Sequence, residues 1–181
     1  MSPVLVVVGG LPATGKSTIA TALALRTSTP YLRVDRIEQA IVAWSALSHP
    51  VGPVGYAVAH VLAREQLELG LDVIVECVNP TALTRDAWVG TAGAAGAALV
   101  QVEVTCSNED EHQRRVETRR SDVEGLVKPQ WTAILDREYE PWLGRPFVID
   151  SSTTSPDSAA QRIASRMASV KQGKAAEGST D

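Results

Sequence analysis

The fold is decided by one glycine-rich stretch, Gly9-Gly10-Leu11-Pro12-Ala13-Thr14-Gly15-Lys16-Ser17-Thr18. Residues 10–17 have the spacing G-x-x-x-x-G-K-[ST] of a phosphate-binding loop. A β-branched run at residues 4–8 precedes it and predicts a buried parallel strand, and residues 19–25 follow with a helical pattern. The alternative is a glycine-rich turn that binds nothing, but the flanking strand and helix are the context that the motif requires. The sequence therefore predicts a nucleotide site at residues 10–18.

Each residue type in this loop has a chemical reason. Glycines let the backbone wrap round a polyphosphate, so that successive N–H groups point at its oxygen atoms. Lys16 is predicted to reach the β- and γ-phosphates, and the Ser17 hydroxyl to ligate Mg²⁺. The helix that begins near Lys16 presents the positive end of its dipole to the same anion. We therefore expect Mg²⁺, with ATP or GTP as the co-substrate.

The composition indicates the class of protein and narrows the partners. Hydrophobic residues make up 44% of the 181 residues, but the chain has one Phe, three Tyr and four Trp, so Val, Leu, Ile and Ala must form most of the core. The net charge of −4 argues against nucleic acid as the principal partner. Cys77 and Cys106 are expected to be thiols rather than a disulfide. No signal segment or membrane span is visible, so we expect a cytoplasmic protein without a membrane partner.

Strand and helix patterns alternate along the chain. The predicted strands span residues 4–8, 31–34, 72–77, 99–105 and 147–150. The helices after the first are predicted near residues 36–47, 56–69, 81–93, 108–120, 129–139 and 156–170. Short strands joined by helical crossovers predict a doubly wound α/β fold with a parallel sheet and helices on both faces. We expect a single domain over residues 1–170 and a disordered tail over residues 171–181.

Asp35 is the candidate for the catalytic base. Ligands in open α/β sheets bind beyond the carboxyl ends of the strands, and Asp35 follows the second predicted strand. A carboxylate there would face the γ-phosphate and accept the proton of an attacking hydroxyl. The alternative is that Asp35 caps a helix beginning at Arg36. The two roles are compatible, because a cap also fixes the carboxylate.

Two further polar residues lie at or just beyond the end of the third predicted strand. Glu76 could orient Mg²⁺ by holding one of its water ligands, and the alternative is a buried salt bridge. Asn79 could hydrogen-bond the acceptor or a phosphate, and the alternative is that it caps the following helix.

An arginine-rich helix is the candidate for a phosphate clamp. Its basic residues are Arg114, Arg115, Arg119 and Arg120. Arg115 and Arg119 are four residues apart and share a face, where two guanidinium groups can offset the charge of a transferring phosphoryl group. The alternative is a set of surface arginines paired with Glu111 or Glu117. The phosphate-binding loop favours the clamp.

The acceptor pocket has two aromatic candidates. Trp44 and Tyr56 flank a loop rich in Pro and Gly at residues 48–55, and pockets of such folds open near loops of this kind. The alternative is that the tryptophans, Trp44 among them, fill the core or its edge.

Taken together, these residues resemble the small P-loop kinases over residues 4–163. Within that superfamily the chain is most similar to the branch of chloramphenicol phosphotransferases and zeta toxins. The shared features are the loop at residues 10–18, an Asp matching Asp35, and a lid helix with arginines matching Arg115 and Arg119. The resemblance implies the strand order 2-3-1-4-5, a helical lid over about residues 108–140, and Asp35 as the base. Relatives often carry Asp where this chain has Glu76.

The sequence thus predicts a phosphotransferase that moves the γ-phosphate of ATP or GTP to a hydroxyl of a small molecule. The resemblance implies a more specific function, that of an antibiotic-resistance kinase acting on chloramphenicol or a nucleoside antibiotic. The alternative is a P-loop ATPase or GTPase switch that acts through a protein partner. A kinase acting on nucleic-acid ends would need a basic groove, for which the arginine helix is the only support. The sequence is compatible with both a monomer and a homo-oligomer.

Overall fold

The computed structural model describes residues 2–118, 129–144 and 146–177. Five parallel strands form one sheet in the order β2-β3-β1-β4-β5. They are β1 (Val4–Gly9), β2 (Tyr31–Arg33), β3 (Val73–Glu76), β4 (Ala98–Thr105) and β5 (Phe147–Asp150). Both the predicted fold class and the predicted strand order are confirmed.

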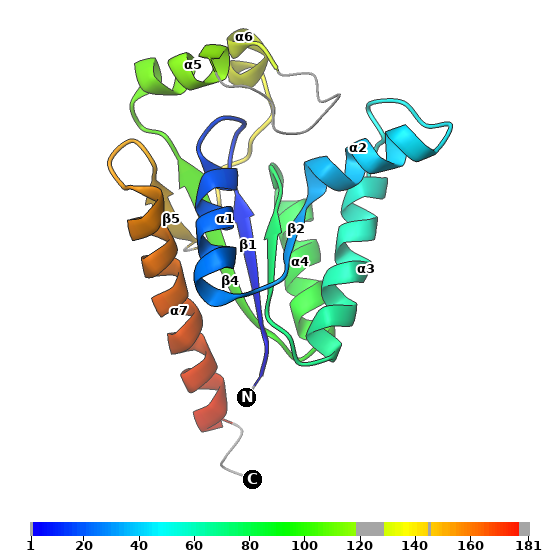
Figure 1. The fold of residues 1–181 in the computed structure, drawn as a ribbon, viewed down its shortest axis with the longest axis vertical. Helices are drawn as coiled ribbons and strands as arrows, with labels where there is room; N and C mark the ends of the chain where they lie inside the picture. The colour runs from blue at the N-terminus through cyan, green and yellow to red at the C-terminus, as the bar shows by residue number, and fades with distance from the viewer. Residues whose placement is uncertain (1, 119–128, 145, 178–181) are drawn as a thin grey trace.

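Helices cover both faces of the sheet and its carboxyl edge (Figure 1). They are α1 (Lys16–Thr27), α2 (Val34–Trp44), α3 (Val54–Glu68), α4 (Ala82–Ala94), α5 (Glu109–Thr118), α6 (Trp131–Leu135) and α7 (Pro156–Glu177). The helices α1 and α7 lie on one face, and α3 and α4 lie on the other. Above the carboxyl ends of the strands lie α5 and α6, over the loop that joins β1 to α1.

The central strand β1 is buried throughout, because both of its faces are covered. Val4, Val6 and Val8 pack with α1 and α7, whereas Leu5 and Val7 pack with α3 and α4. Successive side chains of a strand point to opposite faces, so a run of five apolar residues supplies both halves of the core. Polar residues that could bind or react with a ligand therefore lie at the ends of the strands.

The C-terminal helix is longer than its sequence suggested. We expected a disordered tail from Lys171, but α7 continues to Glu177. Lys171 Nζ lies 2.6 Å from Asp72 Oδ2, and Asp72 Oδ1 accepts a hydrogen bond of 2.9 Å from the Val4 amide. This contact ties the helix to the amino end of β1 and explains why it continues past residue 170.

Among the described residues, no helix combines the length and apolarity that crossing a membrane requires. Cys77 is buried and Cys106 is partly exposed, and both are free thiols, as the sequence predicts. Burial raises the pKa of the Cys77 thiol to about 12, so this thiol stays protonated near neutral pH.

Candidate active site

The phosphate-binding loop joins β1 to α1 and is anchored at its first residue. The Gly10 amide donates a hydrogen bond of 3.1 Å to the carbonyl of Val78, which follows β3. Gly10 has a φ of +142°, and a Cβ at this position would lie 2.2 Å from the carbonyl oxygen of Val104. Only glycine fits here, because any side chain would collide with the backbone of β4. The loop is thus held between two strands.

The interior of the loop is arranged round the carbonyl of Leu11. Lys16 Nζ and Thr14 Oγ1 donate hydrogen bonds of 2.7 and 2.9 Å to this oxygen. Gly15 precedes α1 in a left-handed conformation, so the N-terminus of the helix opens toward the loop. Lys16 is buried, and a lysine beside a helix N-terminus is an arrangement that suits the binding of phosphate.

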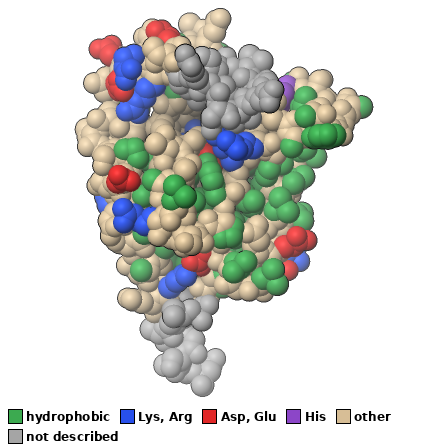
Figure 2. All heavy atoms as spheres, viewed as in Figure 1, with side chains coloured by type: hydrophobic (Ala, Val, Ile, Leu, Met, Phe, Trp, Pro, Cys, Tyr) green, Lys and Arg blue, Asp and Glu red, His purple; other side chains and the backbone are tan. Residues whose placement is uncertain are grey.

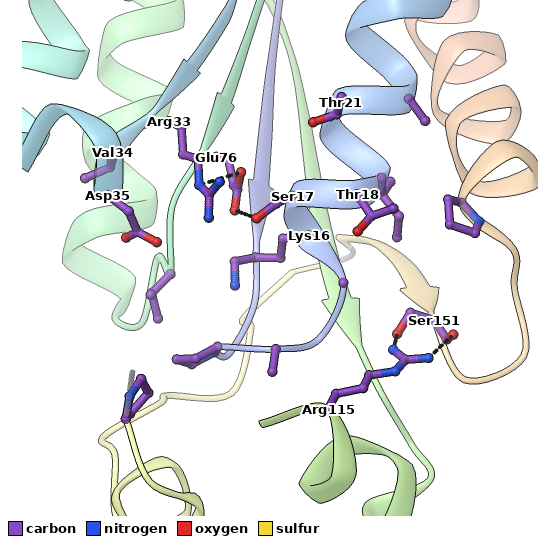
Figure 3. Close-up of a pocket in the computed structure, with 18 of the residues that line it drawn as sticks. Lys16, Ser17, Thr18, Thr21, Arg33, Val34, Asp35, Glu76, Arg115 and Ser151 are labelled. Atoms are coloured by element: carbon purple, nitrogen blue, oxygen red, sulfur yellow. Dashed lines mark hydrogen bonds and ion pairs between the residues drawn. The ribbon is translucent and has the colours of Figure 1, made fainter. Parts of the chain in front are cut away.

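Ser17 and Glu76 meet at the start of α1. The Ser17 hydroxyl donates a hydrogen bond of 2.6 Å to Glu76 Oε1 (Figure 3). A hydroxyl and a carboxylate are hard oxygen ligands of the kind that Mg²⁺ takes, usually alongside several water molecules and phosphate oxygens. The residues present therefore fit the expected metal: Ser17 would hold it, and Glu76 would hold one of its water ligands.

Glu76 is also part of a buried polar cluster. Tyr31 donates its hydroxyl hydrogen to Glu76 Oε2, and Arg33 Nε lies 3.5 Å from the same oxygen. Burial first, and then the charge of Glu76, raise the pKa of Tyr31, which keeps the hydroxyl protonated as a donor. The salt-bridge interpretation is thus correct for Glu76. It coexists with the contact to Ser17.

Asp35 lies in the first turn of α2 and lines the cavity in front of the loop. The helix begins at Val34 with Arg33 as its N-cap residue, so Asp35 does not cap it as the alternative supposed. Its position in the first turn still suits a carboxylate, because the helix dipole stabilises negative charge there. In Figure 3 the Asp35 carboxylate points into the space toward which Lys16 also extends.

Arg115 reaches the loop from α5. Its guanidinium donates to the hydroxyl and the carbonyl of Ser151, over 2.8 and 3.2 Å, and to Glu111 over 2.7 Å. Ser151 lies beside the loop, since a Cβ on Gly15 would be 3.4 Å from the Ser151 Cβ. Hydrogen bonds from Arg114 and then Arg115 lower the pKa of Glu111 to about 2.

This geometry places one arginine of the predicted clamp next to Gly15 of the loop. The surface pairing of Arg115 with Glu111 is present as well, and the clamp stays a prediction. Arg119, the second residue of the clamp, lies outside the described residues.

The three predicted acceptor residues lie in different surroundings. Tyr56 lines the cavity, and its hydroxyl accepts a hydrogen bond of 3.1 Å from the Asn79 amide. That contact uses the backbone amide of Asn79. The side chain of Asn79 is fully buried, and its Oδ1 and Nδ2 atoms have no hydrogen-bond partner among the described residues. Asn79 does not cap α4, because Thr81 does so: its hydroxyl oxygen accepts a hydrogen bond from the amide of Thr84.

Trp44 does not line the cavity. It ends α2 and is 91% exposed, on a side of the molecule where hydrophobic side chains gather over α2 and α3 (Figure 2). At about 1.5 Å per residue, it lies roughly 13 Å along the helix from Asp35. Trp44 therefore lies too far along α2 to line a pocket next to Asp35, and it is too exposed to belong to the core.

Most of the predicted site residues line one large cavity, but Trp44 and Asn79 do not. Its volume is about 1090 Å³, and it extends from the start of α2 and α3, past the loop, to the residues that follow β5. Lys16, Ser17, Asp35, Glu76 and Arg115 all line it. In Figure 3, Asp35 lies on one side of Lys16, and Ser151 lies on the other. The cavity can therefore hold a nucleotide and a second molecule side by side.

Sequence reasoning missed three residues of this region. Ser151 follows β5, so the rule about strand ends could have found it. Glu38 lies on the same face of α2 as Asp35, a signal present in the helical spacing. His112 on α5 lacked a metal-ligand spacing, yet its Nε2 lies 2.9 Å from the carbonyl oxygen of Pro12 in the loop. Because a carbonyl only accepts, this nitrogen carries the hydrogen, and His112 joins α5 directly to the loop.

Comparisons with known proteins agree with this geometry. No curated protein sequence matches the chain. A solved structure from Chloroflexus aurantiacus, provisionally described as a kinase, is 21% identical with a TM-score of 0.73, over 93% of this chain and 98% of that one. The Mycobacterium tuberculosis APS kinase in complex with AMPPNP and APS is 18% identical with a TM-score of 0.68, over 91% and 96%. A gluconokinase from Sinorhizobium meliloti is 19% identical with a TM-score of 0.59, over 92% and 96%.

At these identities the likeness establishes a shared fold. The family model described as an AAA domain matches residues 5–141. This match includes the phosphate-binding loop, Asp35, Glu76 and Arg115. Because the match covers most of the chain, this protein belongs to the AAA domain family.

Proposed function

We propose that this protein is a phosphotransferase that moves the γ-phosphate of ATP or GTP to a hydroxyl of a small molecule. The observation that carries the proposal is the shared cavity: Lys16 of the phosphate-binding loop and the carboxylate of Asp35 line the same space. A nucleotide switch could use such a carboxylate to orient water, but it would not need the space for a second small molecule that this cavity provides. A cytoplasmic location, where nucleoside triphosphates are available, is part of the proposal.

Each residue has a role that follows from its position. The loop amides and Lys16 bind the phosphates, and Arg115 offsets the charge that the phosphoryl group carries during transfer. We assign the same role to Arg119. Asp35 accepts the proton of the acceptor hydroxyl as its oxygen attacks the γ-phosphorus, and the nucleoside diphosphate leaves. Mg²⁺, held through Ser17 and Glu76, would neutralise charge on the phosphates.

Two observations support this function. The Mycobacterium tuberculosis APS kinase, which has the same fold, was solved with AMPPNP and APS bound together. The cavity of this chain is large enough for two ligands of small-molecule size, since ligand pockets typically have about 300–1,000 Å³. The narrower proposal, an antibiotic-resistance kinase, is supported by the resemblance of the loop, Asp35 and the lid sequence to chloramphenicol phosphotransferases.

A transfer assay read by mass spectrometry tests the proposal. Purified protein with Mg²⁺ and ATP or GTP is incubated with hydroxylated antibiotics, nucleosides and sugars. We expect one compound class to gain a phosphoryl group, and EDTA to abolish the gain. Chloramphenicol or a nucleoside antibiotic as the best acceptor would support the narrower form. Nucleotide hydrolysis with no modified acceptor across the panel would instead favour the ATPase or GTPase switch.

Replacing Lys16 with alanine tests the loop. We expect Lys16→Ala to weaken nucleotide binding by about 10- to 100-fold, since hydrogen bonds to charged groups contribute about 1.5–3 kcal/mol. Titration of a fluorescent ATP analogue measures the affinity. Thermal unfolding without nucleotide is the control, because a change there would point to a damaged loop rather than a lost phosphate contact. Unchanged affinity and turnover would contradict the assignment of the loop.

A further inference from the structure

Glu38 is a second carboxylate at the acceptor end of the cavity. It lies three residues after Asp35 on α2, a spacing that puts both side chains on one face of the helix. Both residues line the cavity, together with His49 and Tyr56. The function proposed above uses Asp35 as the base and leaves Glu38 without a role.

The start of α3 is shaped to accommodate this side chain. Gly55 is buried, and a Cβ built on it would lie 2.3 Å from Glu38 Cγ and 2.8 Å from Glu38 Oε1. Any other residue at position 55 would therefore push the carboxylate aside. Glu38 is half-buried against this glycine, which restricts where its carboxylate can lie. The fold keeps a negatively charged group at a defined place beside the base.

The negative charge of the Glu38 carboxylate is only partly balanced by the groups around it. Burial first, and then the charge of Asp35, raise the pKa of Glu38, while His49 acts in the opposite direction. Of the basic residues that line the cavity, Arg33 pairs with Glu76, and Arg115 is bonded to Glu111 and Ser151. Lys16 belongs to the phosphate-binding loop, and Arg137 is an exposed residue of the lid. A hydrogen-bond donor or a cation beside Glu38 would stabilise its carboxylate.

We infer that the acceptor is an uncharged or cationic molecule rich in hydrogen-bond donors, and that Glu38 is the residue that selects it and rejects anions. This inference rests on the function proposed above. A hydroxyl or ammonium group next to the reacting hydroxyl would donate to Glu38, while the reacting hydroxyl donates to Asp35. A phosphate, sulfate or carboxylate on the acceptor would instead meet two carboxylates of the same sign. The expected order of preference is therefore amino alcohols and amino sugars, then neutral polyols, and last anionic acceptors.

The test compares acceptors that share one skeleton and differ in charge. Glucosamine, glucose and gluconate form one set, and adenosine and adenosine 5′-monophosphate form another. Phosphoryl transfer from MgATP or MgGTP to each compound is measured with the full-length wild type, Glu38→Gln and Glu38→Lys. Glu65→Gln, an exposed glutamate of α3 outside the cavity, is the matched control.

We expect the wild type to favour the cationic or neutral member of a set over the anionic one by about 10-fold or more in kcat/KM. Glu38→Gln should reduce that preference by about 10-fold, mainly through KM, and Glu38→Lys should reverse it. Glu65→Gln should leave it unchanged. A structural role for Glu38 would lower all rates together and would not reverse a charge preference.

The possible failures are distinguishable. An anionic acceptor preferred by the wild type, or a preference unaffected by both Glu38 variants, would overturn the inference and leave the phosphotransferase intact. Nucleotide hydrolysis without transfer to any member of either set, or to any compound of the wider panel, would overturn the proposed function and this inference with it.

Discussion

Replacing Asp35 with asparagine is expected to abolish most of the phosphoryl transfer while nucleotide binding remains. The substitution keeps the size and shape of the side chain but removes its charge and its basicity. Loss of a general base slows a reaction by about 100- to 10,000-fold. Asp35 and Lys16 line the same cavity from different elements, α2 and the loop, so the affinity for nucleotide should change by no more than about twofold.

The measurement is single-turnover transfer to whichever acceptor the panel identifies, with nucleotide affinity determined on the same preparations. Asp86→Asn provides a matched control, because Asp86 is an exposed residue of α4 outside the cavity. Undiminished transfer by Asp35→Asn would remove this residue from the mechanism. Loss of transfer together with loss of nucleotide binding would assign Asp35 to the nucleotide site instead.

The strands of the sheet and the loop between β1 and α1 were predictable because they depend on short-range patterns. The apolar run of β1 and the motif that follows it are contiguous, and β5 has the predicted bounds. The strand order came from the resemblance to P-loop kinases, which carries information that the pattern of one sequence lacks.

Helix starts were harder to predict, because caps compete over neighbouring residues. Asp35 and Asn79 are both good capping residues, yet α2 starts before Asp35, and α4 starts after Thr81. Asn79 has a φ of +54° and a buried side chain, a geometry that the sequence does not reveal. At α4 the cap is Thr81, which forms a capping box with Thr84, so two good capping residues competed within one short segment.

Contacts between distant segments could not be predicted from the sequence. Arg115 and Ser151 are 36 residues apart, and nothing in either segment specifies the partner. The contact between Lys171 and Asp72 spans 99 residues and extends α7 beyond its predicted end. Such pairs depend on how the helices pack on the sheet, and this packing becomes visible only in the folded chain.

Arg85 forms another of these long-range clusters. Its side chain is 5% exposed on α4. The guanidinium donates four hydrogen bonds of 2.6–3.1 Å, to the carbonyls of Asn79, Pro80, Glu140 and Pro141. It also stacks 4.4 Å from the centre of the Trp142 ring. One side chain thus joins the segment after β3 to the segment at residues 140–141, ahead of β5.

Removing this guanidinium should destabilise the protein strongly. Arg85→Ala removes a donor from four buried or partly buried carbonyls, of which only that of Pro80 keeps another among the described residues, the Glu140 amide, and it opens a space beside Trp142. Each unsatisfied buried group costs about 1–3 kcal/mol, and partial entry of water offsets some of this, so we expect the free energy of unfolding to fall by about 3–5 kcal/mol. Arg85→Lys should recover little of the loss, because an ammonium cannot reproduce the planar fork that reaches both segments.

Urea unfolding measures the change, with Arg64→Ala as the matched control. Arg64 is 59% exposed on α3 and pairs with Glu68 on the helix surface, so its loss should cost no more than about 0.5 kcal/mol. Equal urea midpoints of unfolding for Arg85→Ala and Arg64→Ala would show that the contacts of Arg85 contribute no stability. If Arg85→Ala is destabilised as expected, its nucleotide affinity at low temperature distinguishes two consequences. Unchanged affinity would mean that the guanidinium stabilises the fold alone, whereas a loss would mean that it also holds the lid over the loop.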